Sequence, residues 1–259
     1  MLAPSKSMDL RASTPFGIKP QQPLFQVEAD KIALKLQSLS RVELINLMGI
    51  SQLTAEAVWQ YYQAWEPAGK GAEGIGKAAL WTYAGDVYKG LQAGTMSPSD
   101  AKWAQQHLLI ASGLYGLVRP YDAIQAYRLE MKTRLTVGRR KSINDFWSEN
   151  LAGRIEIQNA DWLCNCCSDE YAKPILKHAI IPVITPVFFD TKPNGTIGTV
   201  PIYSKLMRGV FARWMIDNRL QTPEQLCSFT AHKYAYNTAL SRPNFPAFSR
   251  PKMIPIKFN

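Results

Sequence analysis

Apolar and polar residues follow a helical period in the N-terminal third of the chain. From Gln26 onward, apolar residues recur at spacings of four and three, at Ile32, Leu36 and Leu39. Such spacing gives an α-helix one apolar face, so we predict a helix over this segment. Ser40 and Glu43 then have the form of a capping box, which predicts the start of a second helix.

The second predicted helix ends at the turn Gly49-Ile50-Ser51, and a third apolar repeat follows it. The whole segment, about residues 40–65, resembles a helix-hairpin-helix motif. In that motif a Gly-hydrophobic-Gly turn presents backbone N–H groups and a helix N-terminus to a DNA phosphate, without reading the base sequence. Ser51 takes the place of the usual second glycine, and it can cap the following helix. A helical hairpin buried only for packing is the alternative.

The rest of the chain combines helical and strand patterns. Apolar runs predict strands over residues 160–168, 180–190 and 198–203. Pro182 and Pro186 place the second of these strands at a sheet edge or a bulge. A helix is predicted after Ser97, because Pro98 then takes the favoured first helical position. We therefore expect an α+β fold, a mixed β-sheet surrounded by helices, in which residues 1–259 form a single domain.

The composition is that of a folded protein, with 46% hydrophobic and 19% charged residues. Thirty Lys and Arg residues against 20 Asp and Glu residues give a net charge of +10. This excess favours nucleic acid as a partner ahead of a membrane surface, and a charge that serves only solubility is the alternative. Because no apolar run approaches a membrane span and no signal-peptide pattern is present, we expect no membrane partner and a cytoplasmic location.

Three of the four cysteines lie within four residues, which is a poor framework for disulfides and favours a reduced protein. The cysteines are Cys164, Cys166, Cys167 and Cys227. Cys164 and Cys167 have C-x-x-C spacing, but the sequence offers no second pair, and its three histidines are far apart. We therefore interpret the three clustered cysteines as core residues, and we predict no metal site and no cofactor.

Residues 112–131, SGLYGLVRPYDAIQAYRLEM, combine glycines, arginines, tyrosines and carboxylates. Gly113 and Gly116 indicate a turn with special backbone angles or a close approach. Arg128 and Glu130 lie two residues apart, which puts them on one side of an extended segment. Arginines on a rigid backbone suit an anion, because the guanidinium fork matches phosphate and carboxylate. A structural network of arginines and carboxylates is the alternative.

This stretch closely resembles the signature of the YaaA family, the peroxide-stress proteins. The resemblance continues, in the family's order, through AGDVYKGL (84–91), AQQHLL (104–109), SDEY (168–171), YSKLMRGVFARWMI (203–216) and NRLQTPEQL (218–226). The turn Pro4-Ser5-Lys6 also resembles the family's N-terminal turn. Relatives are associated with limiting free iron and so with less oxidative DNA damage. The resemblance therefore implies a DNA-binding protein that contributes to peroxide resistance.

Two groups of candidate binding residues follow from these patterns. The first is the hairpin turn, Gly49, Ile50 and Ser51, as a site for the phosphates of double-stranded DNA or another polyanion. The second is a basic cleft for phosphates or a small anionic ligand. The candidates for its lining are Lys6, Arg119, Arg128, Lys205, Arg208 and Arg213.

An enzyme is the alternative function, since the signature residues sit in compact, glycine-bounded blocks rather than in dispersed positions. The cleft would then take a small anionic or nucleobase-like substrate, with a carboxylate or a tyrosine as acid or base. The candidates for that chemistry are Lys6, Asp86, Arg128, Glu170, Tyr171 and Lys205. A binding module for a small phosphorylated ligand, without turnover, is a third alternative.

Overall fold

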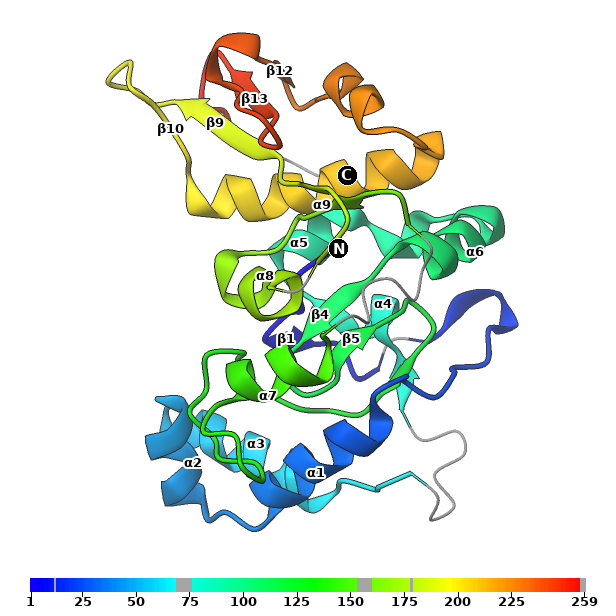
Figure 1. Cartoon of the computed structure of the whole chain (residues 1–259), viewed down its shortest axis with the longest axis vertical. Helices are drawn as coiled ribbons and strands as arrows, with labels where there is room; N and C mark the ends of the chain where they lie inside the picture. The colour runs from blue at the N-terminus through cyan, green and yellow to red at the C-terminus, as the bar shows by residue number, and fades with distance from the viewer. Residues whose placement is uncertain (12, 69–75, 153–159, 178, 257–259) are drawn as a thin grey trace.

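Helices lie at both ends of the molecule and around short strands at its centre (Figure 1). The computed structural model describes residues 1–11, 13–68, 76–152, 160–177 and 179–256. The helices are α1 (Gln26–Gln37), α2 (Arg41–Met48), α3 (Gln52–Gln63), α4 (Ala79–Thr82), α5 (Asp86–Leu91), α6 (Pro98–His107), α7 (Ile143–Asn150), α8 (Asp169–Leu176) and α9 (Pro201–Asn218). Within this described part of the chain, no helix is both long and apolar enough to span a membrane.

The strands are short and form several small sheets. They are β1 (Ser7–Met8), β2 (Lys77–Ala78), β3 (Tyr83–Ala84), β4 (Ile110–Ser112), β5 (Gly116–Val118), β6 (Ala123–Ile124), β7 (Leu163–Cys164), β8 (Val183–Ile184), β9 (Val187–Thr191), β10 (Ile197–Gly198), β11 (Thr230–Ala231), β12 (Tyr234–Tyr236) and β13 (Ala247–Arg250). Parallel and antiparallel pairs both occur among them. The predicted α+β class, with helices around small mixed sheets, is therefore confirmed.

The helices α1, α2 and α3 form the end of the molecule drawn at the bottom of Figure 1. The predicted capping box is present: the Ser40 hydroxyl accepts from the Glu43 amide, and the Glu43 carboxylate accepts from the Ser40 amide at 2.8 Å. Gly49 ends α2 with φ 61°, in the left-handed region that favours glycine. The Ser51 hydroxyl then accepts from the Thr54 amide and caps α3. The predicted pair of helices and the turn between them are confirmed.

The first residues of the chain lie between two central pairs of strands. β4 and β5 form an antiparallel pair, with Ile110 opposite Val118. Leu2 bridges to Ile110 on one side and to Cys166 on the other, next to the parallel pair of β7 and β8. Leu2 therefore joins strands that are distant in the sequence. The strand predicted over residues 160–168 is confirmed only over β7.

The end of the molecule drawn at the top of Figure 1 is a five-stranded sheet in the order β10-β9-β13-β12-β11. β13 runs parallel to β9, and the other neighbouring strands are antiparallel. The ring of Phe211 on α9 lies 5.7 Å from that of Phe188 and 5.3 Å from that of Phe248, so α9 packs on this sheet. The strand predicted over residues 180–190 is divided into β8 and β9 on either side of Pro186. β9 pairs with both β10 and β13, so it lies inside the sheet and not at the edge predicted from the prolines.

The strand predicted over residues 198–203 is wrong beyond its first residue. β10 ends at Gly198, and α9 begins at Pro201. Proline is well suited to the first position of a helix, because the N–H that it lacks would have no partner within the helix there. Tyr203 therefore lies in the first turn of α9.

α9 lies directly on α5, which brings the C-terminal end of the molecule onto its centre. A side chain at Gly209 of α9 would place its Cβ 1.8 Å from the Val87 carbonyl oxygen of α5. A side chain at Gly90 of α5 would place its Cβ 2.2 Å from the Leu206 carbonyl oxygen of α9. The two glycines thus let the helix backbones touch, and this contact sets the position of α9.

Candidate anion-binding site

The turn between β4 and β5 has the two features predicted from its glycines. Gly116 has φ 70°, in the left-handed region. A side chain at Gly113 would place its Cβ 2.4 Å from the Leu129 carbonyl oxygen. Because Gly113 has no side chain, the backbone at Leu129 can lie directly against the turn. The end of the stretch 112–131 therefore folds back onto its beginning.

Three hydroxyl groups form a chain beneath this turn. The Tyr127 hydroxyl lies 2.7 Å from the Tyr83 hydroxyl and 2.7 Å from the Ser112 Oγ. All three residues are buried. Burial raises the pKa of Tyr127 to about 12, although the two hydrogen bonds oppose the rise. These three hydroxyl groups are therefore uncharged at neutral pH. Their hydrogen bonds connect β3 and β4 to the segment that carries the charged residues.

Charged and buried residues alternate in the segment that follows Tyr127. The charged residues are Arg128, Glu130, Lys132 and Arg134, and the buried residues between them are Leu129, Met131 and Thr133. All four charged residues line the same pocket. The prediction that Arg128 and Glu130 share one side is confirmed.

Glu130 is the centre of a small group of charges. The Lys6 Nζ lies 2.6 Å from one Glu130 carboxylate oxygen, and the Lys132 Nζ lies 3.1 Å from the other. The Lys132 amide also donates to the Glu170 carboxylate at 3.4 Å. Burial by itself raises the pKa of Glu130, but the hydrogen bonds and charges of the two lysines outweigh it, and the net pKa is lowered. Glu130 is therefore a carboxylate at neutral pH, which orients the lysines and does not donate a proton.

The pocket beside Glu130 joins this charged group to the helical hairpin. It has a volume of about 410 Å³ and is lined by Asn46, Leu47, Met48, Arg128, Glu130, Lys132, Thr133 and Arg134. Met48 is the last residue of α2 and directly precedes Gly49 of the turn. The sequence placed the hairpin turn and Arg128 in two separate groups, whereas the structure brings the end of α2, next to that turn, and Arg128 to one pocket.

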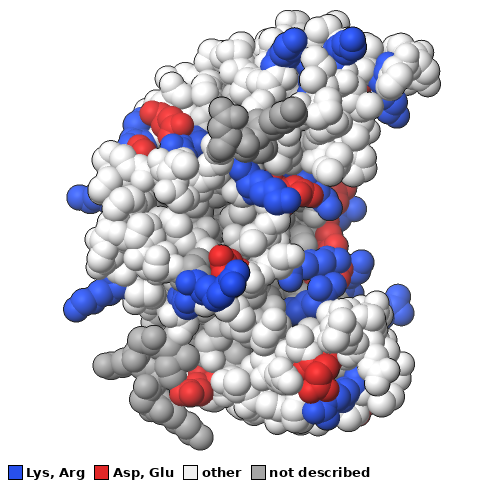
Figure 2. Space-filling view, turned by 180° about the vertical axis from the view of Figure 1, so that it is seen from behind, with Lys and Arg blue, Asp and Glu red and all other residues white. Residues whose placement is uncertain are grey.

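The charged side chains gather around a hollow. Figure 2 shows the molecule from behind, with Lys and Arg side chains on both sides of the hollow across its middle and with Asp and Glu side chains among them. Lys6 and Lys132 pair with Glu130, and Arg128 and Arg134 line the same pocket as Glu130. The second carboxylate of this group, Glu170, accepts from the Lys132 amide. Cations outnumber carboxylates in this group, so it favours an anion.

Comparison with known proteins decides the family. The family model of the peroxide stress protein YaaA matches residues 1–240. The chain belongs to this family. UPF0246 proteins are similar over almost the whole length: one from Ruegeria pomeroyi is 38% identical over 256 residues, 97% of this chain and 98% of the relative. Others from Paraburkholderia xenovorans and Verminephrobacter eiseniae are 39% and 37% identical, each over 96% of this chain and 97% of the relative.

Four of the residues predicted from the YaaA resemblance lie together around Glu130. Lys6 forms an ion pair with Glu130, and Arg128 lines the pocket beside Glu130. Glu170 accepts from the amide of Lys132, which is the other ion-pair partner of Glu130. Tyr171, at the start of α8, is buried, and that burial raises its pKa well above the ordinary value. Tyr171 is therefore a neutral phenol at physiological pH.

Glu130 itself was not among the residues predicted for the site. Its role depends on Lys6, which is distant in the sequence and reaches the site through the pairing of β1 with β3. The alternation of charged and apolar residues after Tyr127 is the signal that could have identified it.

The remaining predicted residue near Lys6 is Asp86, at the start of α5. β1 and β3 pair with Ser7 opposite Ala84, so the turn that carries Lys6 lies beside Gly85. A side chain at Gly85 would place its Cβ 2.6 Å from the Ser5 Oγ. Asp86 directly follows Gly85, and its carboxylate forms an ion pair with Lys89 at 3.7 Å.

Lys205 and Arg208 lie on α9, whereas Asp86 lies on α5, the helix against which α9 packs. Lys205 is exposed in the first turns of the helix, and Arg208 is partly buried. The charge of Arg208 acts on Cys166 and Cys167, whose thiol pKa values it lowers in part. These two residues are held in place by the packing of α9 on α5 rather than by contacts with the Glu130 group.

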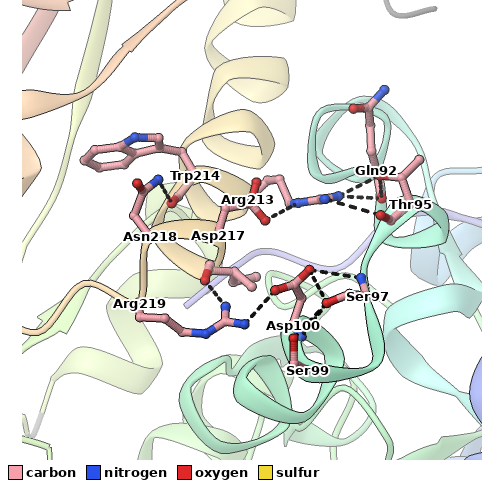
Figure 3. A network of polar contacts seen from close by, with 11 residues as sticks. Gln92, Thr95, Ser97, Ser99, Asp100, Arg213, Trp214, Asp217, Asn218 and Arg219 are labelled. Atoms are coloured by element: carbon pink, nitrogen blue, oxygen red, sulfur yellow. Dashed lines mark hydrogen bonds and ion pairs between the residues drawn. The ribbon is translucent and has the colours of Figure 1, made fainter.

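Arg213 is used to attach α9 to the segment before α6 (Figure 3). Its guanidinium donates to Asp217 at 2.7 Å, to the Gln92 carbonyl oxygen at 3.0 Å and to the Thr95 Oγ1 at 2.7 Å. Arg219, the residue that follows α9, pairs with Asp100 at 2.6 Å. The donors of Arg213 are therefore engaged within the fold, and its role as an anion ligand stays a prediction.

Arg119 lies at the end of β5, beside a buried carboxylate. The Arg119 amide donates to the Asp122 carboxylate at 2.8 Å, and Asp122 is only 5% exposed. Burial raises the pKa of Asp122 to about 7, against the hydrogen bond and the charge of Arg119. Arg119 thus belongs to a different group of contacts from Glu130, and its binding role also stays a prediction.

The raised pKa of Asp122 makes stability depend on pH. Between the ordinary value of 3.8 and about 7, the folded state holds a proton that the unfolded chain has lost, so the free energy of unfolding falls as the pH rises. We expect Asp122→Asn to raise the free energy of unfolding by about 2 kcal/mol at pH 8 and by almost nothing at pH 4. Urea unfolding at both pH values measures this difference, with the exposed Asp9→Asn as the control. Equal effects of Asp122→Asn at the two pH values would contradict it.

Proposed function

We propose that this YaaA-family chain is a cytoplasmic protein that binds double-stranded DNA and contributes to peroxide resistance by limiting free iron and DNA damage. The observation that carries the DNA-binding part is the pocket that joins α2 of the helical hairpin to Arg128, Lys132 and Arg134. A phosphate held there would meet cations on one side and the last residues of α2, next to the hairpin turn, on the other. The iron-limiting part rests on the family resemblance alone.

Several features of the hairpin support a helix-hairpin-helix role. Gly49 and Ser51 are exposed, and Gly49 adopts the left-handed conformation. Ser51 satisfies the Thr54 amide, which leaves the amides of Gln52 and Leu53 as further donors at the start of α3. Leu53 is 84% exposed, so this end of the helix is open to a large partner. These features support phosphate binding at the turn through backbone N–H groups.

The charge distribution supports a polyanion in a basic cleft. The whole chain carries +10, and cations flank the hollow seen in Figure 2. We propose that the cleft extends from the pocket past Lys6 toward Lys205 and Arg208. Binding of this kind depends on phosphates and not on bases, so it should be steeply salt-dependent and largely independent of sequence.

We also propose that residues 1–259 act as one domain. Leu2 pairs with β4 on one side and with Cys166 on the other, and α9 packs directly on α5. These contacts connect both the first residues and the C-terminal half to the centre of the molecule, which supports a single domain.

The test of DNA binding is a salt series with a duplex of arbitrary sequence. Removing two phosphate contacts with Lys132→Ala/Arg134→Ala should weaken binding by about 10-fold and reduce the slope of log affinity against log salt by about 2. Ser51→Glu should also weaken binding, because its carboxylate would repel a phosphate at the turn. The control is Lys177→Ala/Lys192→Ala, which removes the same charge from exposed positions outside the pocket.

The outcomes separate DNA binding at this site from its alternatives. If the control weakens binding as much as Lys132→Ala/Arg134→Ala, the affinity comes from overall charge and the proposed site fails. If the protein does not bind duplex DNA even at low salt, DNA binding itself fails. Ser51→Glu places the contact at the turn only if its loss of affinity exceeds that of an equally charged change at an exposed position, such as Gln60→Glu on α3.

The second candidate function is an enzyme or a binding module for a small anionic ligand. The ion group of Lys6, Glu130 and Lys132, above the buried hydroxyl chain, favours it, because general DNA binding does not need such an exact arrangement. A volume of about 410 Å³ is also in the range of small-molecule sites. In that case Arg128 would hold the anion, and Glu170, which accepts from the Lys132 amide, and Tyr171 would be the candidates to move a proton.

A further inference from the structure

Two thiols face one another where β7 ends. The Cys164 Sγ lies 3.8 Å from the Cys166 Sγ, and both side chains are buried. Residues two apart in an extended segment share a face, which is why the sequence Cys-Asn-Cys brings these thiols together. A disulfide needs its sulfurs about 2.05 Å apart, so rotation of the two side chains would close most of the gap.

A pocket opens beside the pair. It has a volume of about 280 Å³, and both cysteines line it, together with Trp162, Leu163, Ile181 and Met215. A water molecule takes about 30 Å³ in the liquid, so a molecule as small as hydrogen peroxide fits readily. The pair therefore has room for a small oxidant although its side chains are buried.

The surroundings of the thiols assign them different roles. The hydrogen bond with Cys164, followed by the positive charges of the Met1 ammonium and Arg208, lowers the pKa of Cys166 against the effect of burial. The same hydrogen bond and burial raise the pKa of Cys164. Burial raises the pKa of Cys167 to about 12. Because the thiolate is the nucleophile, Cys166 is the residue suited to attack and Cys164 is suited to resolve.

We propose that Cys164 and Cys166 form a peroxide-reactive dithiol that closes to an intramolecular disulfide. The oxidant is a hydroperoxide, for which hydrogen peroxide is the smallest example. This site is separate from the pocket beside Glu130, and its chemistry does not depend on DNA binding.

The reaction balances with one peroxide for each disulfide. The Cys166 thiolate attacks one peroxide oxygen, so that an S–O bond forms and the O–O bond breaks. The departing hydroxide takes the proton that Cys166 released and becomes water. The Cys164 sulfur then attacks Cys166, the S–S bond forms, and the S–O bond breaks. The second hydroxide takes the Cys164 proton. The two thiols lose two electrons, and the peroxide gains them.

The test is a titration of the reduced protein with hydrogen peroxide. The variant Cys167→Ala/Cys227→Ser retains only the proposed pair, so its oxidation is read without interference. We expect the loss of both alkylatable thiols after denaturation and a fall in intact mass by two hydrogens, both reversed by a dithiol reductant. In Cys164→Ala the reaction should stop at a sulfenic acid on Cys166, which a dimedone reagent labels.

Two results would overturn the proposal. One is that Cys167→Ala/Cys227→Ser, folded as judged by circular dichroism, keeps two alkylatable thiols in excess peroxide. The other is that the unmodified protein loses thiols only at Cys227, which is exposed and serves as the internal control. Because both readings come from proteins that retain the pair, a failure of Cys164→Ala to fold does not affect them.

Discussion

Replacement of Gly209 by valine is expected to lower the free energy of unfolding by more than about 3 kcal/mol. A Cβ at this position would lie 1.8 Å from the Val87 carbonyl oxygen and 2.8 Å from the Leu91 amide nitrogen. Both atoms belong to the backbone of α5, which cannot turn aside as a flexible side chain can. The helices would have to separate, and the close packing along their contact would be lost.

A smaller effect acts in the opposite direction. Glycine inside a helix costs about 1 kcal/mol relative to alanine, so filling Gly209 relieves part of that cost. A clash with two backbone atoms outweighs it, and Gly209→Ala should therefore be destabilising too, although less than Gly209→Val. Chemical unfolding followed by circular dichroism measures both variants.

The control for this prediction is Gly94→Ala. A Cβ at Gly94 meets nothing within 4 Å. The free energy of unfolding of Gly94→Ala should therefore stay within about 0.5 kcal/mol of that of the unsubstituted protein. If Gly209→Val is as stable as Gly94→Ala, then the α5–α9 contact is not tight. Since α9 also carries Lys205 and Arg208, a displaced helix should change anion binding at these residues as well.

The other large effect, a loss of about 3–5 kcal/mol, is expected for Arg250→Met. The Arg250 Nε lies 2.5 Å from the Asp190 carboxylate, and the two side chains are 1% and 0% exposed. The Tyr234 hydroxyl also donates to this carboxylate, at 2.9 Å from each oxygen. Removal of the guanidinium would leave a buried negative charge with only a neutral donor beside it, between β9 and β13 at the centre of the C-terminal sheet.

A double-mutant cycle tests whether the charge pair is the cause. Asp190→Asn/Arg250→Met leaves no buried charge, so it should be more stable than Arg250→Met alone. Lys173→Met is the control, because Lys173 pairs with Asp169 at 3.9 Å while 77% exposed, and its free energy of unfolding should hardly change. If the double variant is less stable than Arg250→Met, the unpaired charge is not what destabilises that variant.

Several elements could be predicted from the sequence because their causes are local. Ser40 with Glu43 marked the start of α2, and Pro98 marked the start of α6. Gly49 marked the end of α2, since it supplies a left-handed conformation that other residues adopt at a cost. Each of these signals acts over three or four residues and does not depend on the rest of the fold.

The errors occurred where distant segments decide the outcome. Residues 198–203 have an apolar pattern that suits a strand, but α9 begins at Pro201 and packs on both α5 and the C-terminal sheet. Distant segments also decide the contacts of Arg213. Its donors are engaged with the segment before α6, whose position no pattern within α9 could indicate, and its role as an anion ligand stays a prediction.

The sequence by itself determined the family, the excess of positive charge, the helical hairpin and the set of polar residues from which a site could be built. Only the tertiary structure decided which of those residues meet. It placed Lys6 on Glu130, α2 beside Arg128, and Arg208 near the cysteines. The physical reason is that caps, turns and periodicity arise from neighbouring residues, whereas an ion pair or a pocket needs backbones from distant segments to be packed at fixed distances.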